Sequence, residues 1–399
     1  MNPIHEAIFA GLVKRVRAIL GSHVGQTVGI LGGPGHGDHC RALCLAAAVR
    51  RNAATDRIVC LFRFNGSMVE WDLAYAAKAA GVADDVLMTP ALPYRTHLRS
   101  ELRSKFETFY DSMPFAVGVY PHWGNDREMR QNTLCAATVG DLYSGFPMSN
   151  WKLNDRDEPF SWWELARMTT ELDVRPEDLP VPLECAPLPD DAEMRYFSPH
   201  PDSASRLEAG VTNWERADVH MPRYVVIHNG AGGRTQTKCA PIELFNGIVS
   251  RLAADGVRCV QVGTANEPLV KNAIDRRGLR LPLTARLMKE SLGLVAVEGF
   301  LQYIAAGLRI PAAIFFGPTP YSLFAMPSNL NMLTGKCPQG RCFWLHNRWG
   351  ERCVAQGPEG GPCLNLPSAD SAAEPVAKYI AECEEAGKLK MGAVKEGVA

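Results

Sequence analysis

The chain has 399 residues, of which 46% are hydrophobic and 21% charged, and its formal net charge at pH 7 is −1. This composition is ordinary for a globular protein, and the length exceeds one typical core, so we expect two domains. The near-zero charge gives no general attraction to nucleic acid or to an anionic membrane. No apolar run reaches the roughly 18–20 residues of a membrane helix. No basic-then-apolar signal peptide opens the sequence, and we therefore expect a cytoplasmic protein.

The first half of the chain begins with a helical pattern over residues 3–20, in which apolar side chains recur at helical spacing. A short apolar strand over 27–31 then leads into the glycine-rich turn 32–38 and a helix over 39–51. A strand, a glycine-rich turn and a helix in this order form the entry to a phosphate- or sugar-binding crevice. Asp38 stands where the helix begins, and either an N-cap or a general base suits a carboxylate there.

Strands alternate with helices in the residues that follow. We expect strands over 57–64, 85–88 and 115–120, with helices near 69–80 and 95–112. This alternation is typical of a doubly wound parallel sheet, in which ligands bind beyond the carboxyl ends of the strands. The first domain is therefore expected to be α/β.

A loop with two polar side chains follows the last of these strands. His122 and Asp126 lie there and are candidate contacts for an acceptor molecule, although solvation alone is the commoner explanation for a histidine in a loop. Residues 177–205 are rich in Pro, Asp and Ser without a sustained period, which indicates an interdomain linker. A helix over 203–218 is expected before the second domain.

The second domain opens with a strand over 224–227 and a glycine-rich turn, and Lys238 follows the turn. Glycines let backbone N–H groups approach an anion closely, and a lysine adds a mobile positive charge. The candidate anion-binding residues of the turn are His228, Asn229, Gly230 and Ala231. The pattern therefore predicts an anion-binding pocket at the end of this strand.

Three later strands, expected over 258–262, 293–297 and 312–316, also end in polar turns. The turns contribute Gly263 and Glu267 after the first of these strands, Glu298 and Gly299 after the second, and Gly317, Pro318 and Thr319 after the third. An acid shortly beyond such a strand can bind ribose hydroxyls, which makes Glu267 a candidate for that contact. One polar turn is usually structural, but four turns at one sheet edge favour a binding site.

Twelve cysteines is a high number for a chain of this kind. Eight are scattered, several within apolar runs, and scattered cysteines in a cytosolic protein are usually small buried hydrophobes. The other four, Cys337, Cys342, Cys353 and Cys363, are separated by four, ten and nine residues. Four thiolates suit tetrahedral iron or zinc, with His346 as a substitute ligand, and unligated thiols are the alternative.

Several of these motifs resemble those of glycosyltransferase family 9, the ADP-heptose-using heptosyltransferases. The likeness covers most of the chain and is strongest over 223–320. The family's His-Pro-Gly-Ala and Lys-x-Trp-Pro correspond to His228-Asn-Gly-Ala231 and Lys238-Cys-Ala-Pro241. Its Gly-Asp corresponds to Gly37-Asp38, its Phe-Gly-Pro-Thr to Phe316-Gly-Pro-Thr319, and its Asp-Ser/Thr-Gly-x-x-His is altered to Glu298-Gly-Phe-Leu-Gln-Tyr303.

An acid-glycine pair and a downstream cysteine quartet are similar to the bacterial autotransporter heptosyltransferases, which modify serine hydroxyls of secreted adhesin-type proteins and carry a four-cysteine iron finger. The resemblance implies a GT-B architecture, with two Rossmann-like doubly wound α/β domains that face a cleft and a small cysteine-rich metal finger. Residues 1–200 would form the acceptor-side domain, with Gly37 beside Asp38. Residues 201–399 would form the nucleotide-sugar domain, including the finger at 337–363. A homo-oligomer is a further expectation.

The resemblance also implies an inverting transfer of heptose from ADP-heptose to a hydroxyl, without a metal ion at the reaction centre. Asp38 would take the hydroxyl proton, and Lys238 would stabilise the departing diphosphate. Two alternatives stay open: a lipopolysaccharide-type heptosyltransferase, and a non-catalytic scaffold that binds nucleotide sugars, which Tyr303 and Ala240 in place of the family's His and Trp would suit. A nicotinamide dehydrogenase would need the G-x-G-x-x-G motif that this sequence lacks, and a nucleic-acid-binding zinc ribbon would need a basic stripe.

Overall fold

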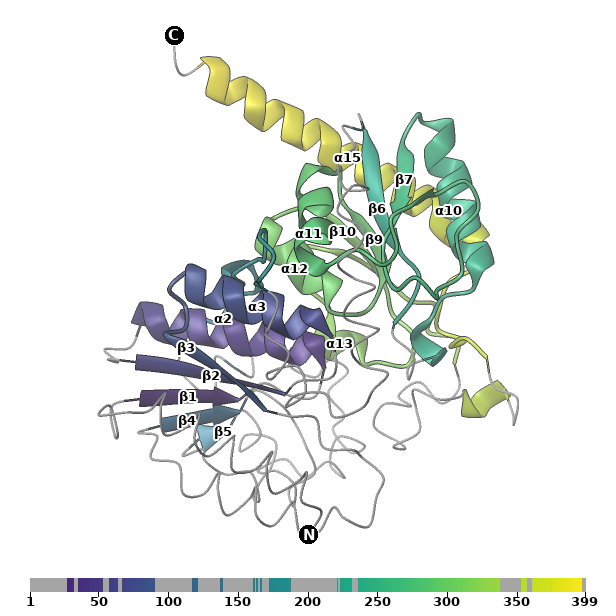
Figure 1. Ribbon diagram of the computed structural model, residues 1–399. Coiled ribbons are helices and arrows are strands. Elements are labelled where there is room, and N and C mark those ends of the chain that lie inside the picture. Colours follow the sequence, from purple (N-terminus) through teal and green to yellow (C-terminus); the bar gives the residue numbers. More distant parts are fainter. Residues whose placement is uncertain are drawn as a thin grey trace. The chain divides into compact units, whose positions relative to one another are not determined.

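The computed structural model describes residues 27–31, 35–52, 57–63, 67–89, 117–120, 137–138, 161, 163, 166, 172–187, 221, 223–231, 236–337, 353–356 and 361–396. The chain divides into two compact units, whose elements are labelled in Figure 1. Unit 1 comprises Met1–Thr212 with the short segment Arg280–Pro282. Unit 2 comprises Asn213–Leu279 with Leu283–Ala399.

Unit 1 contains a five-stranded sheet in the order β3-β2-β1-β4-β5, in which every neighbouring pair is parallel. The strands are β1 (Thr27–Leu31), β2 (Arg57–Arg63), β3 (Asp85–Thr89), β4 (Val117–Tyr120) and β5 (Ala137–Thr138). The first strand of the chain is central, so the strand order reverses between β1 and β4, the place where doubly wound sheets bind ligands. The predicted α/β fold with a parallel sheet is therefore confirmed.

Helix α2 (His36–Asn52) follows β1 and packs on the sheet. Every side chain from Leu43 to Val49 is apolar and buried, and a helix that is apolar on most sides is buried on most sides. The helix begins three residues before the position that the sequence predicts. The reason is that the Gly35 carbonyl accepts the backbone N–H groups of Asp38 and His39 at 2.9 and 3.2 Å, which draws part of the glycine-rich turn into the first helical turn.

Helix α3 (Met68–Ala79) also belongs to unit 1, and a short 3-10 helix, η2 (Pro176–Asp178), lies against α2. Ser67 caps α3, since its hydroxyl oxygen accepts a backbone N–H of the first turn at 3.1 Å. Asp72 on α3 is completely buried and forms an ion pair with Arg280 of the segment Arg280–Pro282. A buried carboxylate needs such a partner, and the pair explains why this short segment belongs to unit 1.

Unit 2 contains a six-stranded sheet in the order β11-β10-β9-β6-β7-β8, and again every neighbouring pair is parallel. The strands are β6 (Tyr224–His228), β7 (Arg258–Gln261), β8 (Ile274–Asp275), β9 (Leu294–Val297), β10 (Ala312–Phe315) and β11 (Leu330–Met332). The first strand of the unit, β6, is central, and the order reverses between β6 and β9. This is the strand order of the dinucleotide-binding doubly wound fold.

Among the described residues, unit 2 contains the helices α10 (Ile242–Ala254), α12 (Leu301–Leu308), α13 (Tyr321–Phe324) and α15 (Ala369–Glu396), the 3-10 helices η4 (Gln236–Lys238) and η5 (Val354–Gln356), and all but the first two residues of α11 (Leu281–Glu290). Helices α10 and α15 lie side by side (Figure 1). Their approach requires Gly247 on α10, because a Cβ atom there would lie 2.6 Å from the Cβ atom of Ala369. Phe245 of α10 packs edge-on against Phe315 of β10, with ring centroids 5.8 Å apart.

Three helices expected from the sequence, over 3–20, 95–112 and 203–218, lie outside the described residues. Within the described residues, no helix combines the length and the apolar character that crossing a membrane requires.

Candidate functional site

The polar turns that the sequence singles out in unit 2 follow four neighbouring strands, β10, β9, β6 and β7. Because parallel strands end at the same edge of a sheet, these turns lie along one edge. His228 ends β6 and pairs in register with Ala296 of β9, and Glu298 follows directly after that strand. The reversal of strand order thus falls between His228 and Glu298, which is where the topology places a ligand site.

Lys238, Glu298 and Thr319 form a polar cluster at the ends of β9 and β10. The Lys238 ammonium forms an ion pair with Oε2 of Glu298, and the Thr319 hydroxyl donates to the same oxygen at 2.9 Å. The Lys238 and Glu298 side chains are 15% and 7% exposed, so the pair is mostly shielded from water. A second contact fixes the strand end, because the Glu298 N–H donates to the Phe315 carbonyl at 2.9 Å. The cluster therefore positions the Lys238 ammonium in the turn where the sequence predicts an anion-binding pocket.

Glu267 and His228 form a second pair at the ends of β6 and β7. Nε2 of His228 lies 3.3 Å from Oε2 of Glu267, and the two side chains are 13% and 12% exposed. Burial by itself raises the pKa of Glu267, but the hydrogen bond and the charge of His228 outweigh it, so the pKa is lowered. The carboxylate stays ionised and able to accept hydrogen bonds from a ligand hydroxyl.

Two glycines leave the space that the Glu267 carboxylate fills. A Cβ atom on Gly230 would lie 2.3 Å from the Glu267 carboxyl carbon, and one on Gly263 would lie 2.1 Å from Oε2. Gly263 also has a φ of 128°, which L-residues rarely adopt. The sequence predicted Gly230 for close approach to an anion and Gly263 as part of a donor-binding turn, and in the structure both glycines adjoin an acid of the same chain.

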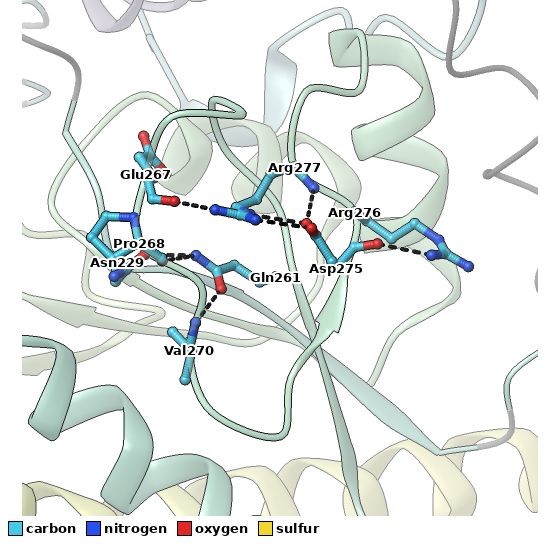
Figure 2. Close-up of polar contacts among 8 residues, drawn as sticks. All are labelled: Asn229, Gln261, Glu267, Pro268, Val270, Asp275, Arg276 and Arg277. Carbon is cyan, nitrogen blue, oxygen red and sulfur yellow. Dashed lines mark hydrogen bonds and ion pairs between the residues drawn. The ribbon is translucent and has the colours of Figure 1, made fainter.

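Gln261, at the end of β7, fixes the loop that carries Glu267 (Figure 2). Its side chain is completely buried and makes three hydrogen bonds. Nε2 donates to Oδ1 of Asn229 at 3.0 Å and to the Pro268 carbonyl at 2.8 Å, and Oε1 accepts the Val270 N–H at 2.7 Å. The network ties the turn after β6 to the turn after β7. Sequence reasoning missed Gln261, although a glutamine that follows the apolar pair Cys259–Val260 of this strand is a signal for such a role.

Arg277 joins the same loop from the other side (Figure 2). Its guanidinium binds both carboxylate oxygens of Asp275 at 2.9 Å and donates to the Glu267 carbonyl. A planar guanidinium suits this double contact, and the arrangement fixes the backbone at Glu267. The remaining predicted donor residues, Ala231, Gly299 and Pro318, lie in the same turns and beside the residues described above.

The segment that carries the last predicted metal ligand packs against the lysine turn. The Cys363 N–H donates to the Thr237 carbonyl at 3.1 Å. Asn365 is buried; its Oδ1 accepts the Cys337 N–H at 3.0 Å, and its Nδ2 lies 3.5 Å from the Gly317 carbonyl oxygen. The cysteine segment thus supports two of the four turns of the site, which the sequence does not reveal.

The predicted four-cysteine metal site is only partly within the described residues. Cys337, Cys353 and Cys363 are buried thiols, whereas Cys342 lies outside the described residues. Among the residues that the structure describes, no three His, Cys, Asp or Glu side chains are arranged to hold a metal ion. The iron or zinc finger therefore stays a prediction.

Asp38 lies in the first turn of α2, directly beyond β1 of unit 1. It is the third residue of the helix rather than its N-cap. Its Oδ2 accepts the Gly35 N–H at 2.9 Å, as the third-position acid of a capping box does, and its Oδ1 pairs with Arg41. Gly37 immediately precedes it. Asp38 therefore stabilises the start of α2, and its side chain remains 13% exposed at the carboxyl ends of the strands.

The other candidate acceptor contacts, His122 and Asp126, lie outside the described residues.

Beside Asp38 lies a second polar cluster, which sequence reasoning missed. Nε2 of His36 lies 2.9 Å from Oε1 of Glu70 and 3.3 Å from the Ser67 hydroxyl. The Ser67 hydroxyl in turn donates to the other Glu70 oxygen at 3.2 Å. A histidine between two glycines of the turn is a signal in the sequence, but nothing there indicates that Glu70, 34 residues away, reaches it.

No protein-family model matches this sequence, and a comparison with curated proteins gives no match. Solved structures are similar in fold. The ADP-heptose LPS heptosyltransferase II of E. coli is 13% identical with a TM-score of 0.51, over 90% of this chain and 99% of that chain. A glycosyl transferase family 9 protein from Veillonella parvula is 12% identical with a TM-score of 0.53, over 90% of this chain and 98% of that chain.

The iron-containing dodecameric glycosyltransferase TibC of enterotoxigenic E. coli is also similar, at 13% identity and a TM-score of 0.51, over 90% of this chain and 76% of that chain. TibC in complex with ADP-D-beta-D-heptose gives the same TM-score. At these identities the likeness shows the fold, which is α/β with parallel sheets and GT-B-like.

Proposed function

We propose that this chain is a glycosyltransferase that moves a heptose, with inversion, from ADP-heptose to a hydroxyl acceptor. The observation that carries the proposal is the Lys238–Glu298–Thr319 cluster at the strand-order reversal of unit 2. It stands on a fold shared with heptosyltransferases, and the motifs around it resemble theirs.

Lys238 suits the diphosphate of the donor. It is held in place by Glu298, and a diphosphate carries more negative charge than one carboxylate, so the ammonium can turn from Glu298 to the phosphate oxygens. Backbone N–H groups of the turn after β6 add neutral donors at the same sheet edge. In a shielded site these groups stabilise the charge that grows on the leaving diphosphate.

Glu267 suits the ribose of the donor. Its carboxylate is ionised, is fixed between Gly230 and Gly263, and belongs to the turn after β7, next to the strand that carries the phosphate turn. Vicinal hydroxyls are natural donors to such a carboxylate. The proposed diphosphate contact after β6 and the proposed ribose contact after β7 therefore lie on neighbouring strands, as the ribose and diphosphate are neighbours in the donor.

In the transfer, one bond forms and one bond breaks at the anomeric carbon of the heptose. The acceptor oxygen bonds to that carbon as the bond to the diphosphate breaks, and ADP leaves with the electron pair. The hydroxyl proton goes to Asp38, whose carboxylate is the acid at the ligand-binding end of the unit 1 sheet.

The acceptor that we propose is a serine hydroxyl of an autotransporter or adhesin protein. The support is the resemblance of the Glu298–Gly299 pair and of the cysteine quartet to the bacterial autotransporter heptosyltransferases. An iron or zinc ion at the cysteines would be structural, because the Cys363 segment supports the lysine turn rather than forming part of the site. Transfer would take place in the cytoplasm, before the acceptor is secreted.

The donor class is tested by ligand-induced stabilisation of the purified protein. ADP-heptose should raise the melting temperature in a concentration-dependent manner, and UDP-, GDP- and CMP-sugars should not, because a ligand stabilises the state that it binds. Lys238→Ala should abolish the shift, whereas Lys271→Ala, which removes an exposed lysine of the same unit, should keep it. An equal shift in Lys238→Ala would refute the role of Lys238, and a shift with another nucleotide sugar alone would refute the donor class.

A further inference from the structure

Asn229 and Gln261 of unit 2 are two amides whose side chains the transfer described above does not use. Asn229 follows β6 directly and is 3% exposed, and Gln261 ends β7 and is completely buried. Nε2 of Gln261 donates to Oδ1 of Asn229 at 3.0 Å (Figure 2). Because an amide has both donors and an acceptor, the remaining contacts of the two side chains show which of their atoms are left for a ligand.

Backbone groups fix the orientation of the Gln261 amide. Its Oε1 accepts the Val270 N–H at 2.7 Å, and a backbone N–H can only donate. Its Nε2 donates to the Pro268 carbonyl at 2.8 Å, and a carbonyl can only accept. Oxygen and nitrogen therefore cannot exchange places in Gln261, and Asn229 receives the second proton of Nε2.

This orientation determines which end of the Asn229 amide is left over. The atom that faces a proton of Gln261 has to be the oxygen, so Nδ2 is the other end of the Asn229 amide. Within the part of the chain that the structure describes, this nitrogen has no hydrogen-bond partner, and it retains some solvent exposure. Asn229 thus presents an NH₂ group that is held in place and accessible to a ligand.

Two backbone features place this NH₂ group between the two parts of the proposed donor site. The Asn229 carbonyl accepts the Ala240 N–H at 3.0 Å, and Ala240 lies two residues after Lys238. The residue after Asn229 is Gly230, where an added Cβ atom would lie 2.3 Å from the carboxyl carbon of Glu267. Asn229 therefore lies between the lysine that we assign to the diphosphate and the acid that we assign to the ribose.

We propose that the Asn229 NH₂ group, oriented by Gln261, donates a hydrogen bond to the phosphate that is bonded to the ribose of the donor. This role rests on the proposed function and adds a neutral donor to the charge of Lys238. Gln261 acts through Asn229 and is a positioning residue. Asn229 stands where the family's His-Pro-Gly-Ala has proline, which offers no such donor.

The chemistry of the NH₂ group favours a phosphate over a hydroxyl. The group can only donate, and the non-bridging oxygens of an ionised phosphate only accept. Hydrogen bonds to a charged acceptor are also stronger than those to a neutral one. In ADP-heptose, the phosphate next to the ribose is the acceptor-only group that lies between the ribose and the second phosphate, and it matches the place of Asn229 between Glu267 and Lys238.

Binding of adenosine, AMP and ADP, measured by titration calorimetry, tests this contact. Asn229→Asp keeps the oxygen that Gln261 binds and replaces the NH₂ group by an oxygen that only accepts. The affinities for AMP and ADP should each fall by about 10-fold or more, and the affinity for adenosine, which has no phosphate, should stay the same.

Two results of this titration would overturn the proposal. One is unchanged affinity of Asn229→Asp for AMP and ADP, because a purely structural Asn229 would need only its oxygen. The other is an equal fall for adenosine, because the contact would then lie on the nucleoside. Asn246→Asp is the matched control: Oδ1 of Asn246 also accepts a backbone N–H, that of Lys271 at 2.8 Å, and all three affinities should equal those of the wild type.

The side-chain amide signal of Asn229 in an NMR spectrum tests the contact without a change of charge at Asn229. The signal is identified by its absence in Asn229→Asp, and it should shift with AMP and ADP but not with adenosine. In Gln261→Glu the new carboxylate can only accept, so the NH₂ group of Asn229 should turn toward it and the signal should no longer respond to AMP. A full response to AMP in Gln261→Glu would overturn the positioning role.

Failure of this proposal and failure of the proposed function give different results. A wild type that binds AMP, ADP and ADP-heptose without a shift of the Asn229 amide signal would overturn the contact and leave the proposed function intact. A wild type that binds AMP and ADP with the shift, but does not bind ADP-heptose, would contradict the proposed function instead.

Discussion

Glu267 is an acid whose charge contributes to stability as well as to the proposed donor site. Its pKa is lowered in the folded state, because His228 outweighs the effect of burial. A depressed carboxyl pKa contributes stability above the ordinary value of 4.5, and that contribution is lost as pH falls through the folded value. We therefore expect the melting temperatures of the wild type and of Glu267→Gln to converge as pH falls from 7 to about 3. A difference between the two that is constant with pH would contradict the assignment.

Gly230 illustrates how a single missing side chain shapes the site. Because the nearest atoms to an added Cβ belong to the Glu267 carboxylate, Gly230→Ala should displace that side chain rather than the backbone. We expect a loss of ADP-heptose affinity by about 10-fold or more, which is about 1.4 kcal/mol, in titration calorimetry with a nearly unchanged melting temperature. The control is Gly387→Ala, where nothing lies within 4 Å of the added atom, and its affinity should equal that of the wild type.

Among the elements, the segment after the cysteines has a supporting role that one side chain can test. Asn365→Ala removes the acceptor of the Cys337 N–H and the amide near the Gly317 carbonyl, both in buried surroundings. Unsatisfied buried groups cost about 1–3 kcal/mol each, so the melting temperature should fall by several degrees. Ser328→Ala, an exposed hydroxyl in the same unit, should change it little. Equal melting temperatures for the two variants would show that Asn365 does not support the turn.

The long strands and the turns after them could be predicted from the sequence for a physical reason. Strands buried on both faces consist of unbroken apolar residues, as over 224–227 of β6 and in Ala312–Phe315, and glycines and polar residues mark their ends. The short strands β8 and β11 have two and three residues and no such run, so their pairing depends on neighbours that the sequence does not reveal. The buried residues of α15 are Ala372, Val376, Ala377 and Ile380, and the two alanines among them weaken the contrast on which a helical pattern depends.

In the candidate site, likewise, the sequence reveals some of the functional side chains but not the contacts between them. Lys238 and Glu298 could be named from their turns, but their ion pair joins residues 60 positions apart and depends on the fold. The dyad of His36 and Glu70 and the network around Gln261 are likewise tertiary contacts between distant segments. Motifs thus predict which turns carry chemistry, and only the packing of strands and helices shows which side chains meet.

For the whole molecule, two parallel-sheet units of a GT-B-like fold each bring an acid or a lysine to the carboxyl ends of the strands of a sheet. The central claim is that the chain turns over ADP-heptose, and ADP release from ADP-heptose by the purified chain tests it most directly. The account predicts release from ADP-heptose but not from UDP-, GDP- or CMP-sugars, with a loss of about 10²-fold or more in Asp38→Asn and in Lys238→Ala. Failure of the wild type to release ADP, while it still binds ADP-heptose, would contradict the claim and favour a non-catalytic scaffold.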